Sequence, residues 1–254
     1  MSPANKITEG LAGPDSKDPD GYLIRWPALY RGTLIKRYKR FLADVKLETG
    51  EAVTAHCANS GSMKACSEPG STVYLTFHDN PKRKLKYTWE LIEMPGSLVG
   101  VNTGVPNKLV KKAIEVGDIE ELRGYDRVQP EVKTIEGTRL DLLLEKNSGE
   151  KCFVEIKNCT LVENGKASFP DAVTTRGRKH LVELMRLKKR GDRAVIFYLI
   201  QRMDADLFSP AEAIDPDYAE ALREAHHKGV EILVYNSFID STGTGIDRKI
   251  PFKL

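Results

Sequence analysis

The sequence predicts a two-domain protein of the α+β and α/β classes, with a small β-barrel followed by an α/β domain. Two observations carry this prediction. Short runs of alternating apolar and polar residues dominate positions 22–95, and strands mixed with helices follow the break at Pro95-Gly96. The length of 254 residues is sufficient for two domains of ordinary size.

The barrel prediction rests on three alternating runs. Residues 41–48, 72–77 and 87–91 each alternate apolar with polar side chains, which is the period of a half-buried strand. Thr49-Gly50 forms a turn before a return strand at 52–56, and Asn80-Pro81 interrupts the chain. Several short strands at this spacing are typical of a small barrel, which we assign to 22–95. Residues 1–21, rich in Pro, Gly, Asp and Ser, are predicted to be a poorly ordered lead-in.

The second domain, assigned to 96–254, opens with a helix over 106–115. Two strands at 138–145 and 152–158 follow, joined by a turn at 147–149. The remaining predicted elements are a helix over 174–190, a buried strand at 194–200, a helix that begins after Asp215 and ends at Gly229, and a final strand at 230–235.

The distribution of apolar and charged residues argues against membrane-spanning and secreted proteins. No run of about 18 apolar residues exists, so a transmembrane helix is not expected. The N-terminus lacks the basic and apolar regions of a secretory signal, so we expect a cytoplasmic, reducing location. Cys152 and Cys159 are interpreted as buried thiols. Cys57 and Cys66 flank a loop, where a metal clip or disulfide is the less favoured alternative.

Positive charge is concentrated in the barrel half. The whole chain carries a net charge of only +3, but residues 22–95 hold 12 basic and 7 acidic residues. The basic residues form two runs with a tyrosine in or beside each. Cations for phosphates and rings for base stacking predict DNA binding, whereas two solvated charge runs are the alternative. The candidate DNA contacts here are Lys36, Arg37, Tyr38, Lys39, Arg40, Lys82, Arg83 and Lys84.

The candidate catalytic side chains lie on the two strands predicted at 138–145 and 152–158. Leu140, Leu142 and Leu144 are expected on one face of the first strand, with Asp141 on the other. Glu155 and Lys157 share a face of the second strand. If the strands pair as a hairpin, these three polar side chains converge.

Two carboxylates and a lysine on otherwise apolar strands are costly to bury without partners. A hard divalent cation such as Mg²⁺ or Mn²⁺ is one such partner, since it prefers oxygen ligands. The cation would activate water for phosphodiester hydrolysis, with Asp141 and Glu155 as its ligands and Lys157 stabilising the negative charge. A surface ion pair between Glu155 and Lys157 is the alternative.

Asp141 and the following Glu155-Ile156-Lys157 resemble the motif of the PD-(D/E)XK nuclease superfamily. The segment 175–181 resembles the helix that often supplies further polar residues to that site. Arg176 and His180, four residues apart, share one face of this helix, and with Lys179 they complete the predicted DNA contacts. A solvated helix residue is the alternative for His180.

The chain from about Gly32 onwards also resembles the sugar fermentation stimulation protein A family. The resemblance rests on a series of motifs in order: GTLIKRYKRFLADV at 32–45, CANSGSM at 57–63, WE at 89–90, VNT at 101–103, FPDAV at 169–173, RGRKHL at 176–181 and GVEIL at 229–233. It implies an N-terminal OB-fold-like barrel and a C-terminal PD-(D/E)XK nuclease-like α/β domain. It also implies DNA binding and a link to the regulation of sugar metabolism.

One departure from the superfamily bears on activity. Many members carry an acid on the helix before the first motif strand, whereas the matching face here offers Asn107, with Glu131 as a substitute ligand further on. An amide is a poorer metal ligand than a carboxylate. A non-catalytic DNA-binding transcriptional co-regulator is therefore the second hypothesis, and either a monomer or a homodimer fits the sequence.

A third and less favoured hypothesis is a sugar-responsive enzyme or a small-molecule sensor. It depends on the loop 57–63, in which backbone N–H groups of Asn59, Ser60 and Gly61 could hold an anion. A tight turn without a ligand is the favoured alternative for this loop.

Overall fold

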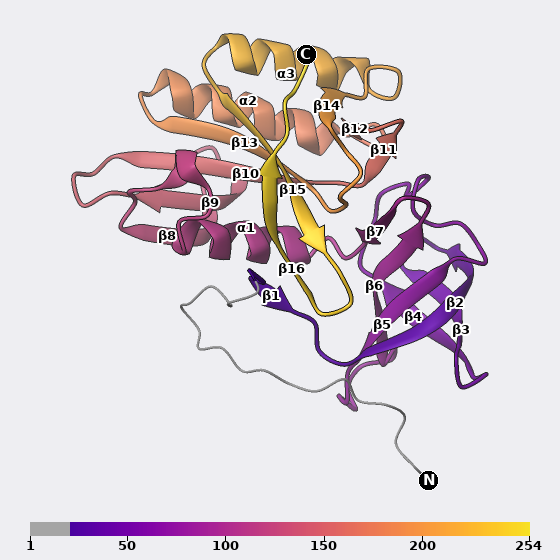
Figure 1. The fold of residues 1–254 in the computed structure, drawn as a ribbon. Coiled ribbons are helices and arrows are strands. Elements are labelled where there is room, and N and C mark those ends of the chain that lie inside the picture. Colours follow the sequence, from indigo (N-terminus) through magenta and orange to yellow (C-terminus); the bar gives the residue numbers. More distant parts are fainter. Residues whose placement is uncertain (1–20) are drawn as a thin grey trace.

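The computed structural model describes residues 21–254, which fold into a barrel and a larger α/β domain lying side by side (Figure 1). The predicted lead-in falls almost wholly outside the described residues. No helix among the described residues is long and apolar enough to cross a membrane.

The barrel is a six-stranded sheet in the order β4-β3-β2-β5-β6-β7, in which an additional parallel pairing of β4 with β6 closes the ring of five strands. Its inward positions are the apolar members of the alternating runs, and Val45, Leu75 and Trp89 are completely buried in its core. The barrel strands are β2 (Leu29–Tyr38), β3 (Leu42–Leu47), β4 (Ala52–Cys57), β5 (Thr72–Phe77), β6 (Tyr87–Met94) and β7 (Ser97–Gly100).

The α/β domain is built on a seven-stranded mixed sheet in the order β1-β16-β15-β13-β10-β9-β8. The three central strands β10, β13 and β15 run parallel and are buried on both faces, which explains their long apolar runs. The strands of this sheet are β1 (Ile24–Arg25), β8 (Arg127–Lys133), β9 (Arg139–Glu145), β10 (Lys151–Cys159), β13 (Arg193–Ile200), β15 (Glu231–Ile239) and β16 (Gly243–Lys249).

Helices cover both faces of this sheet (Figure 1). On one face α1 (Val105–Glu115) packs its apolar stripe against the sheet, and η1 (Glu120–Leu122) follows it. On the other face lie α2 (Thr175–Lys189) and α3 (Pro216–His227), beside a small sheet of β11 (Leu161–Glu163), β12 (Lys166–Phe169) and β14 (Leu207–Pro210).

Helix caps place the starts of α2 and α3 where the sequence predicts them. The Thr174 hydroxyl accepts a hydrogen bond from Gly177 N at 3.0 Å, and Asp215 Oδ1 accepts one from Tyr218 N at 3.0 Å. Asp215 Oδ2 also accepts from Thr174 N at 2.7 Å, so a single carboxylate fixes both helix starts. This fixes the orientation of α2, which carries residues of the candidate site.

The described chain begins in the α/β domain. Residues of β1 pair with β16, so the barrel begins at β2 rather than at residue 22. The predicted final strand is followed by β16, and β8 borders β9 at the edge of the sheet, although neither strand was predicted. Both are polar strands with weak alternation, because much of their length is exposed.

The two domains contact each other through backbone and side chains. Gly100 N donates to Gln201 O at 2.9 Å, and Met203 N donates to Ser97 Oγ at 3.0 Å. The four cysteines are all buried and free, so the alternative of a disulfide at Cys57 and Cys66 is wrong in this structure.

Candidate functional site

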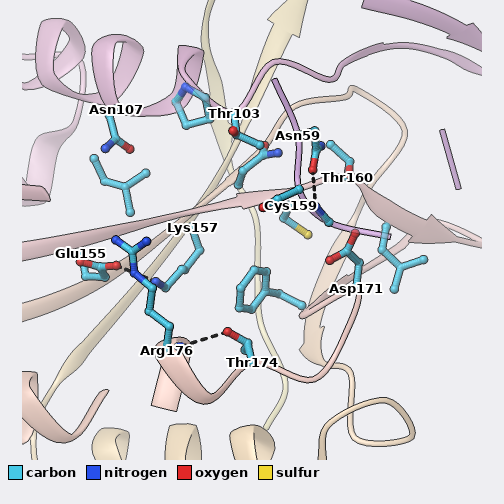
Figure 2. Close-up of a pocket in the computed structure, with 18 of the residues that line it drawn as sticks. Asn59, Thr103, Asn107, Glu155, Lys157, Cys159, Thr160, Asp171, Thr174 and Arg176 are labelled. Atoms are coloured by element: carbon cyan, nitrogen blue, oxygen red, sulfur yellow. Dashed lines mark hydrogen bonds and ion pairs between the residues drawn. The ribbon is translucent and has the colours of Figure 1, made fainter. Parts of the chain in front are cut away.

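A cleft of about 320 Å³ lies between the two domains. Figure 2 shows Asn107 on one side of Glu155 and Lys157, with Asn59 and Asp171 at the other end of the cleft. The barrel contributes the loop 59–61, the α/β domain contributes the ends of β9 and β10, and the start of each of α1 and α2 completes the wall. All three predicted catalytic residues, Asp141, Glu155 and Lys157, line this cleft.

Strand pairing brings the three residues together. β9 and β10 form the predicted antiparallel hairpin, with Val154 opposite Leu142. Val154 and Ile156 pack on the α1 side of the sheet, so Glu155 and Lys157 point to the α2 side.

Leu140 departs from the predicted alternation of β9. It packs in the core under α2 rather than with Leu142 and Leu144 under α1. The neighbouring strand β8 loses regular pairing at Glu131, whose φ of 53° lies in the left-handed region. The register of β8 against β9 is the same on both sides of Glu131, so the interruption inserts no residue.

Glu155 is the centre of a buried polar cluster. Its side chain is almost fully buried, with the residue 2% exposed, and Lys157 Nζ donates to Glu155 Oε1 at 2.6 Å. His180 Nδ1 also contacts Glu155 Oε1 and lies 3.3 Å from Lys157 Nζ. Arg176 Nε, a donor, faces His180 Nε2 at 3.5 Å, which fits the tautomer with its proton on Nδ1 donating to Glu155.

The surroundings shift the pKa values of the two carboxyl groups in opposite directions. Burial, and then the charge of Glu155, raise the pKa of Asp141 above its ordinary value. Burial also acts to raise the pKa of Glu155, but the hydrogen bond from His180 and the charge of Lys157 outweigh it, so that pKa lies below its ordinary value. Glu155 is therefore the carboxylate that stays ionised most readily.

Asp141 is held from two sides. Its Oδ1 accepts from Asn107 Nδ2 at 2.8 Å, and its Oδ2 accepts from Ile156 N at 2.8 Å. Asn107 thus reaches the site from α1 as predicted, and it does so as a hydrogen-bond donor to the carboxylate.

Glu131 lies apart from this cluster. It does not line the cleft, its side chain is 72% exposed, and its Oε2 pairs with Arg139 Nη1 at 3.3 Å. Within residues 21–254, no group of three or more His, Cys, Asp and Glu side chains is arranged to hold a metal ion. Of the predicted metal ligands, Asp141, Glu155 and Asn107 line the cleft and Glu131 does not.

One buried atom tests whether a cation fits between Asp141 and Glu155. Glu155 Oε2 is buried and has no hydrogen-bond partner, whereas Oε1 has two. A carboxylate oxygen buried without a partner is costly, and a divalent cation removes that cost. Mg²⁺ usually binds through one or two carboxylates and keeps several waters, so the pair Asp141 and Glu155 fits such an ion.

The three predicted DNA contacts on α2 have different positions. Arg176 is exposed and lines the cleft, and Lys179 is exposed on the outer side of the helix. His180 is buried and bonded to Glu155, so it is not on a surface that DNA can reach. Sequence spacing placed His180 on the correct helix face but could not show how deep that face lies.

The first basic run forms the end of β2 and the turn into β3. Lys36, Lys39 and Arg40 are exposed, and Lys36 Nζ lies 3.7 Å from Asp44 Oδ2. The hydroxyl of Tyr38 donates to Asp44 Oδ1 at 3.1 Å, so the Asp44 carboxylate interacts with both Lys36 and Tyr38.

Arg37 has a structural role inside the same run. Its guanidinium donates to the carbonyl oxygens of Arg40, Asn59 and Gly61 at 3.0, 2.8 and 2.9 Å. These bonds fix the basic turn beside the loop 59–61 that lines the cleft. Lys39 and Arg40 therefore lie next to the candidate site.

The second basic run lies in the loop between β5 and β6. Lys82 and Lys84 belong to this loop, and Arg83 Nη2 donates to Thr88 Oγ1 at 3.0 Å. Beside the run, Tyr30, Phe77 and Tyr87 form a ring cluster with centroids 5.2–6.1 Å apart. The tyrosine that the sequence places beside this run is Tyr87, and its packing against Tyr30 and Phe77 of other strands becomes visible only in the structure.

The barrel loop is fastened to the α/β domain by Asp171. Its carboxylate Oδ2 accepts from Ser62 Oγ and from Met63 N, both at 3.1 Å. A Cβ at Gly61 would lie 2.5 Å from the same oxygen, so glycine permits the close approach. Sequence motifs contained Asp171 and Ser62 but gave no sign that they meet.

Of the three backbone N–H groups proposed to hold an anion, that of Gly61 is engaged within the protein. Gly61 N donates to Asn59 Oδ1 at 2.8 Å, and Met63 N donates to Asp171. Asn59 Nδ2 donates to Val101 O at 3.1 Å. These bonds hold the loop as an ordered turn against its neighbours, in keeping with the favoured alternative.

Comparisons with known proteins agree with this architecture. Two protein-family models match the chain. The family model described as the SfsA N-terminal OB domain matches residues 35–101, and the one described as the sugar fermentation stimulation protein RE domain matches residues 104–243. Two curated proteins named sugar fermentation stimulation protein homolog, from Geobacter sulfurreducens and Pelobacter propionicus, are each 54% identical to the chain. The first match covers 88% of this chain and 95% of the relative, and the second covers 90% and 99%.

A solved structure, that of Pyrococcus furiosus SfsA in complex with Ca²⁺, is 28% identical with a TM-score of 0.84 and covers 92% of this chain and 99% of that one. The predicted fold class, an OB-type barrel followed by a nuclease-like α/β domain, is confirmed. The chain belongs to the sugar fermentation stimulation protein family.

Proposed function

We propose that this protein binds DNA with little sequence preference and hydrolyses phosphodiester bonds at the cleft, with Mg²⁺ or Mn²⁺ as cofactor. The observation that carries the proposal is the placement of Asp141, Glu155 and Lys157 in one cleft, where Glu155 Oε2 is buried without a partner. A buried polar atom without a hydrogen-bond partner is uncommon in native proteins, and this one belongs to a residue that lines the cleft.

Each residue has a distinct role in this proposal. Asp141 and Glu155 would hold the cation, which when bound supplies an activated water and a positive charge beside the phosphate. The ammonium group of Lys157 stabilises the negative charge that develops on the phosphoryl oxygens. His180 and Asn107 orient the carboxylates through their hydrogen bonds, and the exposed Arg176 is placed to contact a phosphate.

DNA binding is supported by the basic turn beside the cleft. Lys36, Lys39 and Arg40 are exposed there, and backbone-directed cations give affinity without sequence readout. The related Pyrococcus furiosus SfsA was solved with Ca²⁺, which supports a divalent-cation site in this chain. Four free thiols suit the expected cytoplasmic location.

The test uses wild type, Asp141→Ala and Glu155→Gln with single-stranded, duplex and branched DNA and either metal. Wild type should cut at least one substrate, and each variant should lose activity by a factor of about 10² to 10³ while its affinity for DNA without metal changes little. Cleavage that is equal in wild type and both variants would assign the activity to a contaminant. If no DNA is cut by wild type, hydrolysis is not the function.

One observation favours a second function, that of a non-catalytic DNA-binding co-regulator with a role in sugar metabolism. Asn107 contributes an amide where a further carboxylate would strengthen metal binding, and it donates to Asp141. Under this function, Asp141→Ala binds DNA as wild type does and neither protein cuts. Substitution Asn107→Asp separates the two cases, because it should strengthen Mn²⁺ binding measured by calorimetry only if Asp141 and Glu155 hold the metal.

A further inference from the structure

We infer that the cleft accepts an unpaired nucleic-acid strand rather than an intact duplex, and that the barrel loop 59–61 makes this selection. This inference rests on the proposed function and names the substrate class of the same site. Three features carry it: the position of the loop, the depth of the reactive groups, and a second cavity that adjoins the cleft.

The loop forms a wall of the cleft together with the catalytic strands. Asn59, Ser60 and Gly61 line the same space as Asp141 and Glu155, although they belong to the other domain. A nucleic acid that reaches the carboxylates therefore has to pass between the barrel and the α/β domain.

The space available between the domains is small. A cavity of about 320 Å³ is near the lower limit of small-molecule pockets, which span roughly 300–1,000 Å³. The major groove of duplex DNA alone is about 12 Å wide, so an intact duplex is far bulkier than this cleft. One nucleotide of an unpaired strand is the unit that such a space can hold.

The reactive groups lie deep. Glu155 is 2% exposed, and the side chain of Lys157 is 12% exposed. A Mg²⁺ ion bound by carboxylates contacts its oxygen ligands at about 2.0–2.1 Å, so the target phosphate has to enter the cleft. A paired strand could enter only after local unpairing, which costs a few kcal/mol per nucleotide. A strand that is already unpaired does not have this cost.

The loop is held too firmly to move aside at low cost. Arg37 donates to the carbonyl oxygens of Asn59 and Gly61, and Asp171 accepts from Ser62 and Met63. Ser60, at the tip of the loop, is exposed and lines the cleft. The wall is therefore a fixed part of the site.

A strand longer than one nucleotide has a path beyond the cleft. A second cavity, of about 640 Å³, shares Leu161, Ser168 and Asp171 with the first. Lys64 and Lys166 line it, together with the acidic Glu163. A polymer can thus continue past the site, which favours a strand over a free nucleotide.

The experiment compares three DNA probes on full-length protein: a single-stranded oligonucleotide, its blunt duplex, and the same duplex with a central unpaired bubble. Cleavage is followed with Mn²⁺, and affinity is measured by fluorescence anisotropy with Ca²⁺. The single strand should be cut about tenfold or more faster than the blunt duplex, and the bubble should be cut within its unpaired segment.

Ser60→Trp fills the mouth of the cleft from an exposed position. It should lower the rate on the single strand and the bubble about tenfold, whereas Thr49→Trp, in the exposed turn between β3 and β4, should match wild type within about twofold. Melting temperatures check that both variants fold. As a second measurement independent of folding, a photoreactive base in the unpaired segment should crosslink wild type at 59–61.

Two results would overturn the inference. One of them leaves the proposed nuclease function standing, and the other rejects that function as well. A blunt duplex cut as fast as the single strand, with Ser60→Trp equal to wild type, would leave the proposed nuclease function intact but reject the selection for unpaired strands. Failure of wild type to bind or cut any of the three probes would reject the proposed function itself.

Discussion

Lys157 and Lys36 each face a carboxylate, yet their surroundings give the two pairs different uses. Lys157 Nζ lies 2.6 Å from Glu155 in a pair whose side chains are 12% and 3% exposed. Lys36 Nζ lies 3.7 Å from Asp44, and its side chain is 61% exposed. An exposed pair contributes only about 0–1 kcal/mol, so Lys36 can exchange Asp44 for a phosphate at little cost. The buried pair cannot separate cheaply, which keeps its atoms in place for chemistry.

The comparison separates a rigid region, proposed to be catalytic, from an adaptable region, proposed to bind DNA. The largest expected effect concerns the rigid one. His180→Ala removes a partner of Glu155 and should lower kcat about 10- to 100-fold with little change in KM, because outer hydrogen-bond partners orient metal ligands. Val182→Ala, on the same helix and at an exposed position, is the matched control. A KM change without a kcat change would mean that His180 contacts substrate rather than positioning Glu155.

The proposed role of the binding region is tested by removing its positive charge. The triple variant Lys36→Gln, Lys39→Gln and Arg40→Gln should reduce the slope of log affinity against log salt by about 2 to 3, at roughly 0.7–0.9 per phosphate contact. The rate at saturating substrate should stay unchanged.

The charge-matched control replaces exposed lysines at the start of β10 and at the ends of α2 and α3, far along each element from the cleft: Lys151, Lys189 and Lys228. An equal loss of affinity in this control would show that net charge matters and that the turn beside the cleft does not.

Asp171 connects the two regions, and its removal should have an intermediate effect. Asp171→Ala leaves Met63 N without its acceptor, whereas the Ser62 hydroxyl keeps the main-chain oxygen of residue 171, to which it donates at 2.8 Å. The lost acceptor should lower the free energy of unfolding by about 1–3 kcal/mol in a urea titration. Asp171→Asn keeps one acceptor oxygen and should recover part of the loss. Asp206→Ala, which breaks only an exposed pair with Arg248, should change stability by less than about 1 kcal/mol.

The smallest expected effect is a pH-dependent gain in stability. Because burial and Glu155 raise the pKa of Asp141, the folded protein holds that proton more tightly than the unfolded chain does. The resulting stability is complete below the ordinary pKa of 3.8 and is lost as the pH rises through the raised value.

At neutral pH, ionised Asp141 therefore destabilises the metal-free fold. Asp141→Asn should raise the melting temperature by a few degrees, since 1 kcal/mol corresponds to roughly 2–4 °C in a chain of this size. The gain should vanish as the pH falls towards 3.8. Glu131→Gln, which removes an exposed carboxylate, serves as the control. A constant gain at every pH would contradict the assignment to titration of Asp141.

Some features of the site could be predicted because they depend on short-range pattern. The alternation in 152–158 places Glu155 and Lys157 on one face of β10, and the turn at 147–149 forces the hairpin that brings Asp141 beside them. The caps at Thr174 and Asp215 are equally local. Buried central strands and helices were found for the same reason, since their apolar periodicity is strong.

Other features depend on contacts between segments that are far apart in the chain. Exposed polar strands such as β8 and β16 carry weak alternation, so their pairing became visible only in the sheet. Arg37 looked like its basic neighbours, but its guanidinium is used by carbonyl groups of a loop more than twenty residues away. A charge run in a sequence does not show which of its members already have a partner.

The sequence by itself determined the two-domain fold, the hairpin and the strand faces that carry the candidate site residues, because local periodicity and turn residues act over a few positions. Only the tertiary structure decided that His180 is a buried partner of Glu155, that Glu131 lies apart, and that a barrel loop forms a wall of the catalytic cleft. Those outcomes depend on burial depth and on packing between domains. Both are set by which distant surfaces meet, and spacing along one chain does not encode that directly.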